Sequence, residues 1–397
     1  QLLLFSMSVF CLFRILEKLI TKRWIVITAT LLYGVFPIAS NFLYYTLSEG
    51  VTPAFVIFYV YFLTMAFQSI ELKSKRNYYL KASFMLAFLI LTRPVLTLFG
   101  LGLPVFLYQD YKDKLSKFSL SLQMLKYGII SFSLLLVWEA RNYTIVNEFA
   151  GLHPIYYEDG NSIYRPVHQK IWALGKCWGI TGEEFHTTIG PIWKNAIYDD
   201  QFDDKYIANF IRKIPSEAKR ELDTIQIFSA FKMYQQTVLV QKPYFLNKLP
   251  MPMERSQIEQ QTMDEFVAIT DQYNSTHLFQ YHVLIPLKYF KDISFHSNLS
   301  LHIFQHSFRG NFFMESVRVI SLSIHFSVFI LMFVLFFIKG YWPHKSVIVY
   351  SVIFYITFVT YVYREHEDRY TLPVLPILFV ASAVAIDRII PKAKLKK

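Results

Sequence analysis

Charged residues are scarce in this sequence. Aspartate, glutamate, lysine and arginine make up 17% of the 397 residues, against roughly a quarter in ordinary soluble domains. Hydrophobic residues reach 54%, yet the mean hydropathy is only modestly positive. These values exclude an ordinary soluble domain, and they predict membrane helices diluted by a sizeable water-exposed portion.

Cysteine and the common catalytic motifs are also missing or rare. The only two cysteines are Cys11, in an apolar run, and Cys177, in a polar region, so no internal disulfide is expected. The sequence has no Walker loop, dinucleotide fingerprint, HExxH, CxxC pair or GxSxG elbow. These absences argue against an ATPase, a redox enzyme and a serine hydrolase.

The net charge of +11 first suggests a nucleic-acid partner, but the placement of the basic residues argues against one. Lysine and arginine gather in short loops between apolar runs, which is the pattern of cytoplasmic loops in membrane proteins. We therefore expect a lipid bilayer as the surroundings and no nucleic acid. The apolar runs fall at 1–16, 24–47, 51–70, 79–92, 95–109, 121–138, 316–338, 346–363 and 370–387.

These runs predict an all-α integral membrane protein with about nine spans and a mostly helical outer soluble insert. Residues 79–109 allow one long kinked helix or two short spans hinged at Pro94. Two spans keep every basic loop on one side, so we expect two. The predicted divisions are membrane helices at 1–138, an extracytoplasmic insert at 139–311, and C-terminal membrane helices with a basic cytoplasmic tail at 312–397.

The first apolar run is short for a span. It begins at Gln1 without a methionine and meets Arg14 before the roughly 20 residues that a bilayer crossing needs. We expect a cut inside a helix, so that the N-terminal part of the protein is missing; a signal peptide is the weaker alternative because no basic segment precedes the run.

Two helices are expected within the insert. Pro215 and Ser216, followed by an apolar-periodic stretch to about Val240, predict a capped helix that Pro243 ends. A second amphipathic run covers 253–272, and its predicted wet face carries three acidic residues: Glu254, Glu259 and Asp264.

Ionisable residues cluster at the predicted outer ends of the spans, where charge is costly and therefore a functional candidate. The alternative is that they only mark where helices leave the bilayer. A secondary transporter would place polar groups near the bilayer midplane, whereas charges at one interface suit an enzyme that handles a lipid-borne polar group. The clusters are Glu49, Arg93, the group Glu139, Arg141 and Asn142, and residues 364–369.

Four segments carry a resemblance to a known superfamily. YGVFPIASNFLYYTLSE, LTRPVLTL, WEARNYTIVNEF and EDRYTLPVLPILF resemble, in this order, landmarks of GT-C membrane glycosyltransferases. The similar branches are the protein mannosyltransferase, aminoarabinose transferase and lipopolysaccharide galacturonosyltransferase-like families. The resemblance covers about half of the chain, and the long insert after WEARNY departs from it.

This resemblance implies a multi-spanning GT-C-like bundle that transfers a sugar from a polyprenyl-phosphate donor to a glycan, lipid or protein acceptor of the cell envelope. It implies a catalytic Asp in the first outer loop, which would lie upstream of Gln1. Glu49 is a candidate for assistance as an acceptor or metal contact, but not for the general base. Arginine binds phosphate bidentately, so the expected donor-phosphate contacts are Arg369, Arg141 and Arg93. The expected substrate contacts are Asn142, Asn161 and Tyr370.

A divalent cation is a further candidate component. Glu365 and Asp368 belong to a dense acidic group beside His366, and carboxylates suit Mg²⁺ or Mn²⁺. Neighbouring residues on one loop cannot all converge on one ion, so solvated charge is the alternative interpretation.

The sequence thus predicts a glycosyltransferase of the bacterial inner membrane, with its active face and insert on the periplasmic side. Two other classes stay open: a lipid-linked-glycan transporter or flippase without bond chemistry, and a membrane scaffold without catalytic activity. Transfer of a labelled sugar to an acceptor separates the enzyme from both.

Overall fold

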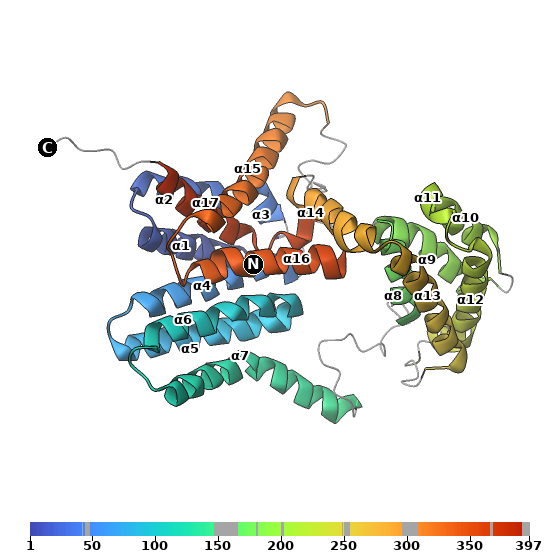
Figure 1. The fold of residues 1–397 in the computed structure, drawn as a ribbon, viewed down its shortest axis with the longest axis horizontal. Helices are drawn as coiled ribbons and strands as arrows, with labels where there is room; N and C mark the ends of the chain where they lie inside the picture. The colour runs from blue at the N-terminus through green and yellow to red at the C-terminus, as the bar shows by residue number, and fades with distance from the viewer. Residues whose placement is uncertain are drawn as a thin grey trace. The chain divides into compact units, whose positions relative to one another are not determined.

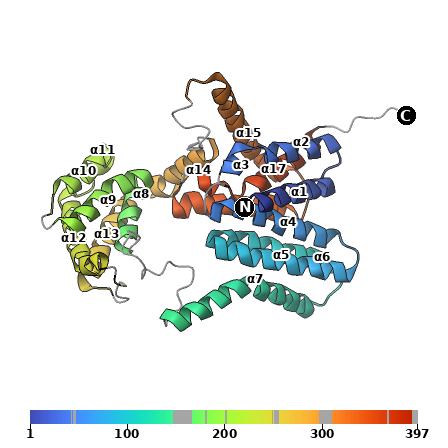
Figure 2. The same cartoon turned by 180° about the vertical axis from the view of Figure 1, so that it is seen from behind.

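Figure 1 shows the fold of the chain in a computed structural model, and Figure 2 shows it from behind. The structure describes residues 1–41, 43, 48–146, 166–179, 182–199, 202–247, 249, 255–295, 309–365 and 368–390. Every regular element in these ranges is a helix, as the sequence predicts. The chain divides into two compact units, Gln1–Leu152 with Phe290–Lys397, and His153–Tyr289.

The first unit contains the membrane helices. Among its described residues, four helical segments are long and apolar enough to cross a membrane: Ser48–Gln68, Lys117–Ile145, Phe312–Phe337 and Ser346–Tyr363. These segments mark the chain as a membrane protein, which confirms the prediction that it has membrane-spanning helices. Its remaining helices are shorter or more charged, so the predicted count of nine spans stays a prediction. The helices of this unit are α1 (Leu2–Leu19), α2 (Arg23–Gly34), α3 (Pro37–Asn41), α4 (Thr52–Gln68), α5 (Leu72–Thr92), α6 (Gly102–Tyr111), α7 (Lys117–Val146), α15 (Phe312–Phe337), α16 (Ser351–Thr357) and α17 (Leu375–Ile389).

The chain reverses direction at Arg93 and Pro94. α5 ends at Thr92, Arg93 is extended, and the 3₁₀ segment η3 (Pro94–Leu101) leads into α6. Proline lacks a backbone N–H and disfavours helical conformation in the residue before it, so the helix has to end here. The rings of Tyr79 near the start of α5 and Tyr111 at the end of α6 lie 6.3 Å apart, which confirms two antiparallel limbs hinged at Pro94.

Two groups of helices form the core of this unit. Figures 1 and 2 show α4, α5 and α7 stacked side by side, and α4 packs on α5 and α5 on α7. α17 packs against α1, α2, α4 and α15, and it is buried from Leu375 to Ala385. Its small residues Ala381, Ser382, Ala383 and Ala385 allow the neighbouring helices to approach closely.

The second unit is a bundle of shorter helices around its own apolar core. Its described helices are α8 (Pro166–Lys176), α9 (Gly182–Tyr198), α10 (Lys205–Lys213), α11 (Ser216–Lys219), α12 (Thr224–Leu246) and α13 (Gln257–Thr276). The π-helical turn η4 (Gln280–Leu284) and α14 (Ile285–Phe295) follow, and α14 continues from this unit into the first one.

Two details of the insert differ from the sequence prediction. The long helix begins at Thr224 rather than near Ser216, because Asp223 caps it by accepting hydrogen bonds from the backbone N–H groups of Ile225 and Gln226. That helix also continues through Pro243 to Leu246. Glu259 lies in the first turn of α13 and is only 8% exposed, so it is not on the wet face.

Candidate functional site

Glu49 is the first of the site residues predicted from the sequence. It lies in the short 3₁₀ turn η2 (Ser48–Gly50) directly before α4. The hydroxyl of Thr52 donates to the carbonyl of Ser48 at 2.5 Å and closes this turn. The Ser48 hydroxyl donates to Glu49 Oε2 at 3.2 Å. The Glu49 side chain is buried, so its carboxylate needs a charged partner.

Arg93 is that partner. Its Nη2 forms an ion pair with Glu49 Oε1, and its Nη1 donates to the carbonyl of Arg369 at 3.5 Å. The guanidinium also stacks on the ring of Tyr370, 5.4 Å from the centroid. Arg93 is therefore held from three sides and fixes the 369–370 segment to the break after α5.

Arg369 and Tyr370 form the other wall of this cluster. Arg364 ends the π-helical turn η8 (Phe358–Tyr363) in a left-handed conformation with φ 55°, and it is buried together with Glu365. The 3₁₀ turn η9 (Asp368–Tyr370) follows, and Arg369 stacks on the Tyr370 ring at 5.3 Å. The ring of Tyr370 thus contacts two guanidinium groups.

Tyr355 of α16 completes the support of Tyr370. Its hydroxyl donates to the carbonyl of Tyr370 at 2.8 Å. Because a tyrosine held at both ring and backbone has little freedom to move, Arg93, Arg369 and Tyr370 form one preorganised group. We call Glu49, Arg93, Arg369, Tyr370 and Tyr355 the arginine–tyrosine cluster.

The predicted residues of α7 form a separate group. Arg141 stacks on Trp138 at 5.1 Å, and its Nη1 donates to Asn142 Oδ1 at 3.2 Å. Asn142 is 2% exposed. Glu139 is notable, because both of its carboxylate oxygens are buried and neither has a hydrogen-bond partner among the residues that the structure describes. Burying a carboxylate without a hydrogen-bond partner is unfavourable. Glu139 is therefore a further candidate residue for contact with a substrate hydroxyl.

α5 and α7 bring the two groups to the same end of the first unit. The rings of Tyr79 in α5 and Tyr127 in α7 contact at 5.8 Å, and the helices run in the same direction (Figure 1). Arg93 follows Tyr79 by 14 residues, and Arg141 follows Tyr127 by the same number. The packing therefore brings Arg93 and Arg141 towards the same end of α5 and α7, and the predicted outer face stays a prediction.

The metal and sugar candidates are only partly covered by the structure. Among the described residues, no group of three histidine, cysteine, aspartate or glutamate side chains is placed to hold a metal ion. Glu365 is buried, whereas the side chain of Asp368 and all of Asn161, His366 and Glu367 lie outside the described residues. The metal site and the Asn161 contact stay predictions.

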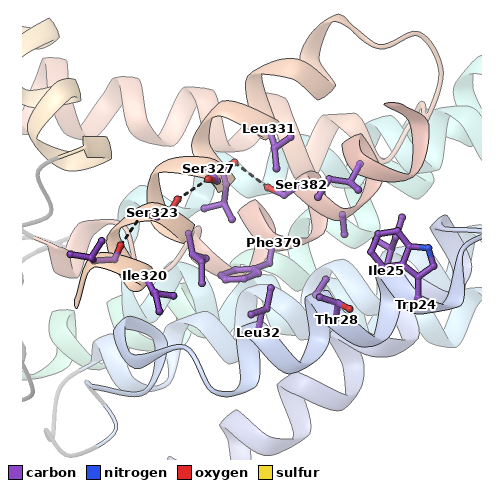
Figure 3. A pocket seen from close by; sticks show the side chains of 16 residues that line it. Trp24, Ile25, Thr28, Leu32, Ile320, Ser323, Ser327, Leu331, Phe379 and Ser382 are labelled. Carbon is purple, nitrogen blue, oxygen red and sulfur yellow. Dashed lines mark hydrogen bonds between the residues drawn. The ribbon is translucent and has the colours of Figure 1, made fainter. Parts of the chain in front are cut away.

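An apolar groove of about 390 Å³ lies between α2, α15 and α17 (Figure 3). Three serines line it, yet their hydroxyls are used within the protein: Ser323 donates to Val319, Ser327 to Ser323, and Ser382 to Leu378 and Val328. The groove therefore presents almost only hydrocarbon to an occupant. The other lining residues that Figure 3 labels are Trp24, Ile25, Thr28, Leu32, Ile320, Leu331 and Phe379.

The groove and the arginine–tyrosine cluster use neighbouring parts of the sequence. α17 begins at Leu375, five residues after Tyr370. Its residue Phe379 lines the groove and stacks edge-on against Phe36 at 5.3 Å.

The opposite ends of the helices hold one buried and one half-buried ion pair that the sequence argument missed. Lys75 Nζ lies 2.6 Å from Asp110 Oδ1, and the Tyr79 hydroxyl donates to Asp110 Oδ2 at 2.6 Å. Lys22 Nζ lies 3.2 Å from Asp387 Oδ1 and also donates to the carbonyls of Asp387 and Ile390. The sequence did hold a signal for both pairs: Asp110 and Asp387 each lie at the end of an apolar run, on the side where the basic loops are expected.

Comparison with known proteins adds no relative. No protein-family model, curated protein or solved structure matches this chain.

Proposed function

We propose that this protein is a membrane glycosyltransferase that moves a sugar from a polyprenyl-phosphate donor to an acceptor hydroxyl. The observation that carries the proposal is the arginine–tyrosine cluster, in which Arg93 and Arg369 both contact Tyr370 at one end of the membrane helices. Fixed guanidinium groups beside a membrane suit a lipid-borne phosphate, because arginine stays charged and matches phosphate geometry.

The apolar groove supports a lipid-linked donor. A polyprenyl chain needs a hydrocarbon surface, and the serine hydroxyls that line the groove are already bonded to helix carbonyls. The phosphate would lie at the cluster and the chain in the groove. The nine-span, GT-C-like arrangement in the bacterial inner membrane, with the cluster on the periplasmic side, belongs to the same proposal.

In the proposed reaction each of these residues has a separate role. The acceptor oxygen attacks the anomeric carbon of the sugar, and the bond from that carbon to the phosphate oxygen breaks. The lipid phosphate leaves with the bonding electrons, and Arg369, Arg141 and Arg93 stabilise its charge. A carboxylate takes the acceptor proton, an effect typically worth about 10²–10⁴ in rate. Glu49 is engaged with Arg93, so its part is to orient Arg93.

The test uses the whole protein in proteoliposomes with a donor whose sugar is radiolabelled. Arg369→Ala should lower sugar transfer on the order of 10²-fold or more, because one electrostatic stabiliser of the leaving phosphate is lost. Arg388→Ala is the matched control, since Arg388 stacks on Tyr341 at the end of α17, and it should keep full activity. Unchanged transfer in Arg369→Ala would refute the role of Arg369.

The same assay separates the enzyme from a flippase. A flippase moves the labelled donor across the bilayer but leaves the label on the lipid, whereas a transferase moves it to the acceptor. Label that relocates and never leaves the lipid, in the unaltered protein, would exclude the glycosyltransferase.

A further inference from the structure

An exposed apolar stripe runs along the helix that leads out of the second unit. Its residues are large and well exposed: Leu278 (59%), Phe279 (67%), Val283 (37%), Leu284 (43%) and Leu287 (56%). The opposite face of the same helix is buried through Ile285, Tyr289 and Ile293. One face therefore packs on protein, and the other presents five large apolar side chains within ten residues.

The stripe is continuous with a membrane-packed helix. α14 runs without a break from Ile285 to Phe295, and Phe290 lies 6.0 Å from Phe333 of α15, one of the segments able to cross a membrane. Ile293 is buried in the apolar core of the first unit. Leu287 and Phe290 belong to this same helix, three residues apart in the sequence.

The charges beside the stripe fit a lipid surface. No aspartate or glutamate occurs from Gln272 to Lys291, although the adjoining residues Asp271 and Asp292 are acidic. Lys288 and Lys291 are exposed next to the stripe. Lysines beside an apolar helix face are the composition of helices that lie in the membrane interface, where the ammonium groups meet lipid phosphates.

We propose that this stripe is an interfacial anchor: η4 and α14 lie at the bilayer surface with Phe279, Val283 and Leu287 inserted among the lipids. Such faces sit roughly 5–10 Å into the boundary between headgroups and acyl chains. The anchor ties the second unit to the membrane independently of any enzymatic activity. Its occupant is lipid, not a second copy of the chain or another protein.

The test measures lipid exposure at single positions in the full chain, reconstituted in nanodiscs with anionic lipid. Cys11→Ala removes the accessible thiol, whereas Cys177 is fully buried and stays as an unlabelled background. Single cysteines replace Phe279, Val283 or Leu287 and carry a nitroxide. The control is Ile225→Cys at the start of α12, an exposed apolar position outside the stripe.

At the three stripe positions, collisions with dissolved oxygen should exceed those with a water-soluble nickel chelate, and at Ile225 the order should reverse. Stripe labels that behave like Ile225 would overturn the anchor, because the face would then meet water. Labels shielded from both reagents would also overturn it, because protein would then cover the face. A Lys288→Gln/Lys291→Gln variant should shift the stripe labels towards water in anionic lipid but not in zwitterionic lipid.

Discussion

Glu49, which is buried, and Arg93, which is half-buried, form an ion pair that joins the turn before α4 to the residue after α5. The pair holds Arg93 where it contacts both the carbonyl of Arg369 and the ring of Tyr370. One interaction between residues 44 positions apart therefore sets the geometry of the arginine–tyrosine cluster.

Breaking this pair should destabilise the protein strongly. Glu49→Gln leaves the Arg93 charge buried without its partner, at a cost of about 3–5 kcal/mol in the free energy of unfolding. Arg93→Gln should cost a similar amount, and the double variant less than the sum of the two. Unfolding in detergent measures all three. The exposed pair Arg14–Glu17 is the control, where Glu17→Gln should cost at most about 1 kcal/mol. Additive costs at Glu49 and Arg93 would contradict a direct coupling.

Gly102 permits a close approach between α6 and the π-helical turn η7 (Ser346–Tyr350). A methyl group at this position would overlap the Val347 side chain, so Gly102→Ala should destabilise the protein by about 1–3 kcal/mol. Val347→Ala in the same chain should recover part of that loss. Gly128→Ala on α7 meets open space and should instead stabilise by about 0.5–1 kcal/mol. Equal effects of the two alanine substitutions in thermal unfolding would disprove the close approach.

His344 should make stability depend on pH. It is buried in the turn before η7, between the rings of Phe67 and Phe106, and burial lowers its pKa from 6.5 to about 4. The folded protein therefore binds this proton less readily than the unfolded chain does. Stability is fully present above pH 6.5 and is lost as pH falls towards 4, by about 3 kcal/mol.

Unfolding of the protein and of His344→Leu at pH 7 and pH 4.5 measures this contribution. The substitution should flatten the pH dependence in this window, since leucine does not titrate. His282→Gln, at an exposed position, is the control and should leave the difference between the two pH values in place. A pH profile unaltered by His344→Leu would assign the dependence to other groups.

Filling the apolar groove should weaken use of a long-chain donor. Ala29 lines the groove, and Ala29→Phe would occupy space that the proposal gives to a polyprenyl chain. We expect KM for a long-chain donor to rise roughly tenfold, the effect of about two methylene groups losing apolar contact, with kcat little changed. A short-chain donor should be much less affected. Ala268→Phe, at an exposed position of α13, controls for the added bulk. A lower kcat with unchanged KM would place the groove outside donor binding.

The sequence by itself determined where the chain forms apolar helices and where it breaks. The run predicted at 346–363 matches the segment Ser346–Tyr363, and the reversal predicted at Pro94 is the one observed. Hydropathy and proline act within a few residues, so they can be interpreted without knowing the fold. A helix also begins at Ser216, as these local signals predict, but α11 ends at Lys219, and Asp223 caps the separate long helix α12.

Only the tertiary structure decided which charged residues are buried and what they contact. Arg93 was predicted as a phosphate contact, but the sequence did not show its ion pair with Glu49 or its stacking on Tyr370. Lys22 and Asp387 lie 365 positions apart and meet only because α17 packs against α2. The burial of a charge depends on which helices surround it, and that neighbourhood is set by packing across the whole chain rather than by nearby sequence.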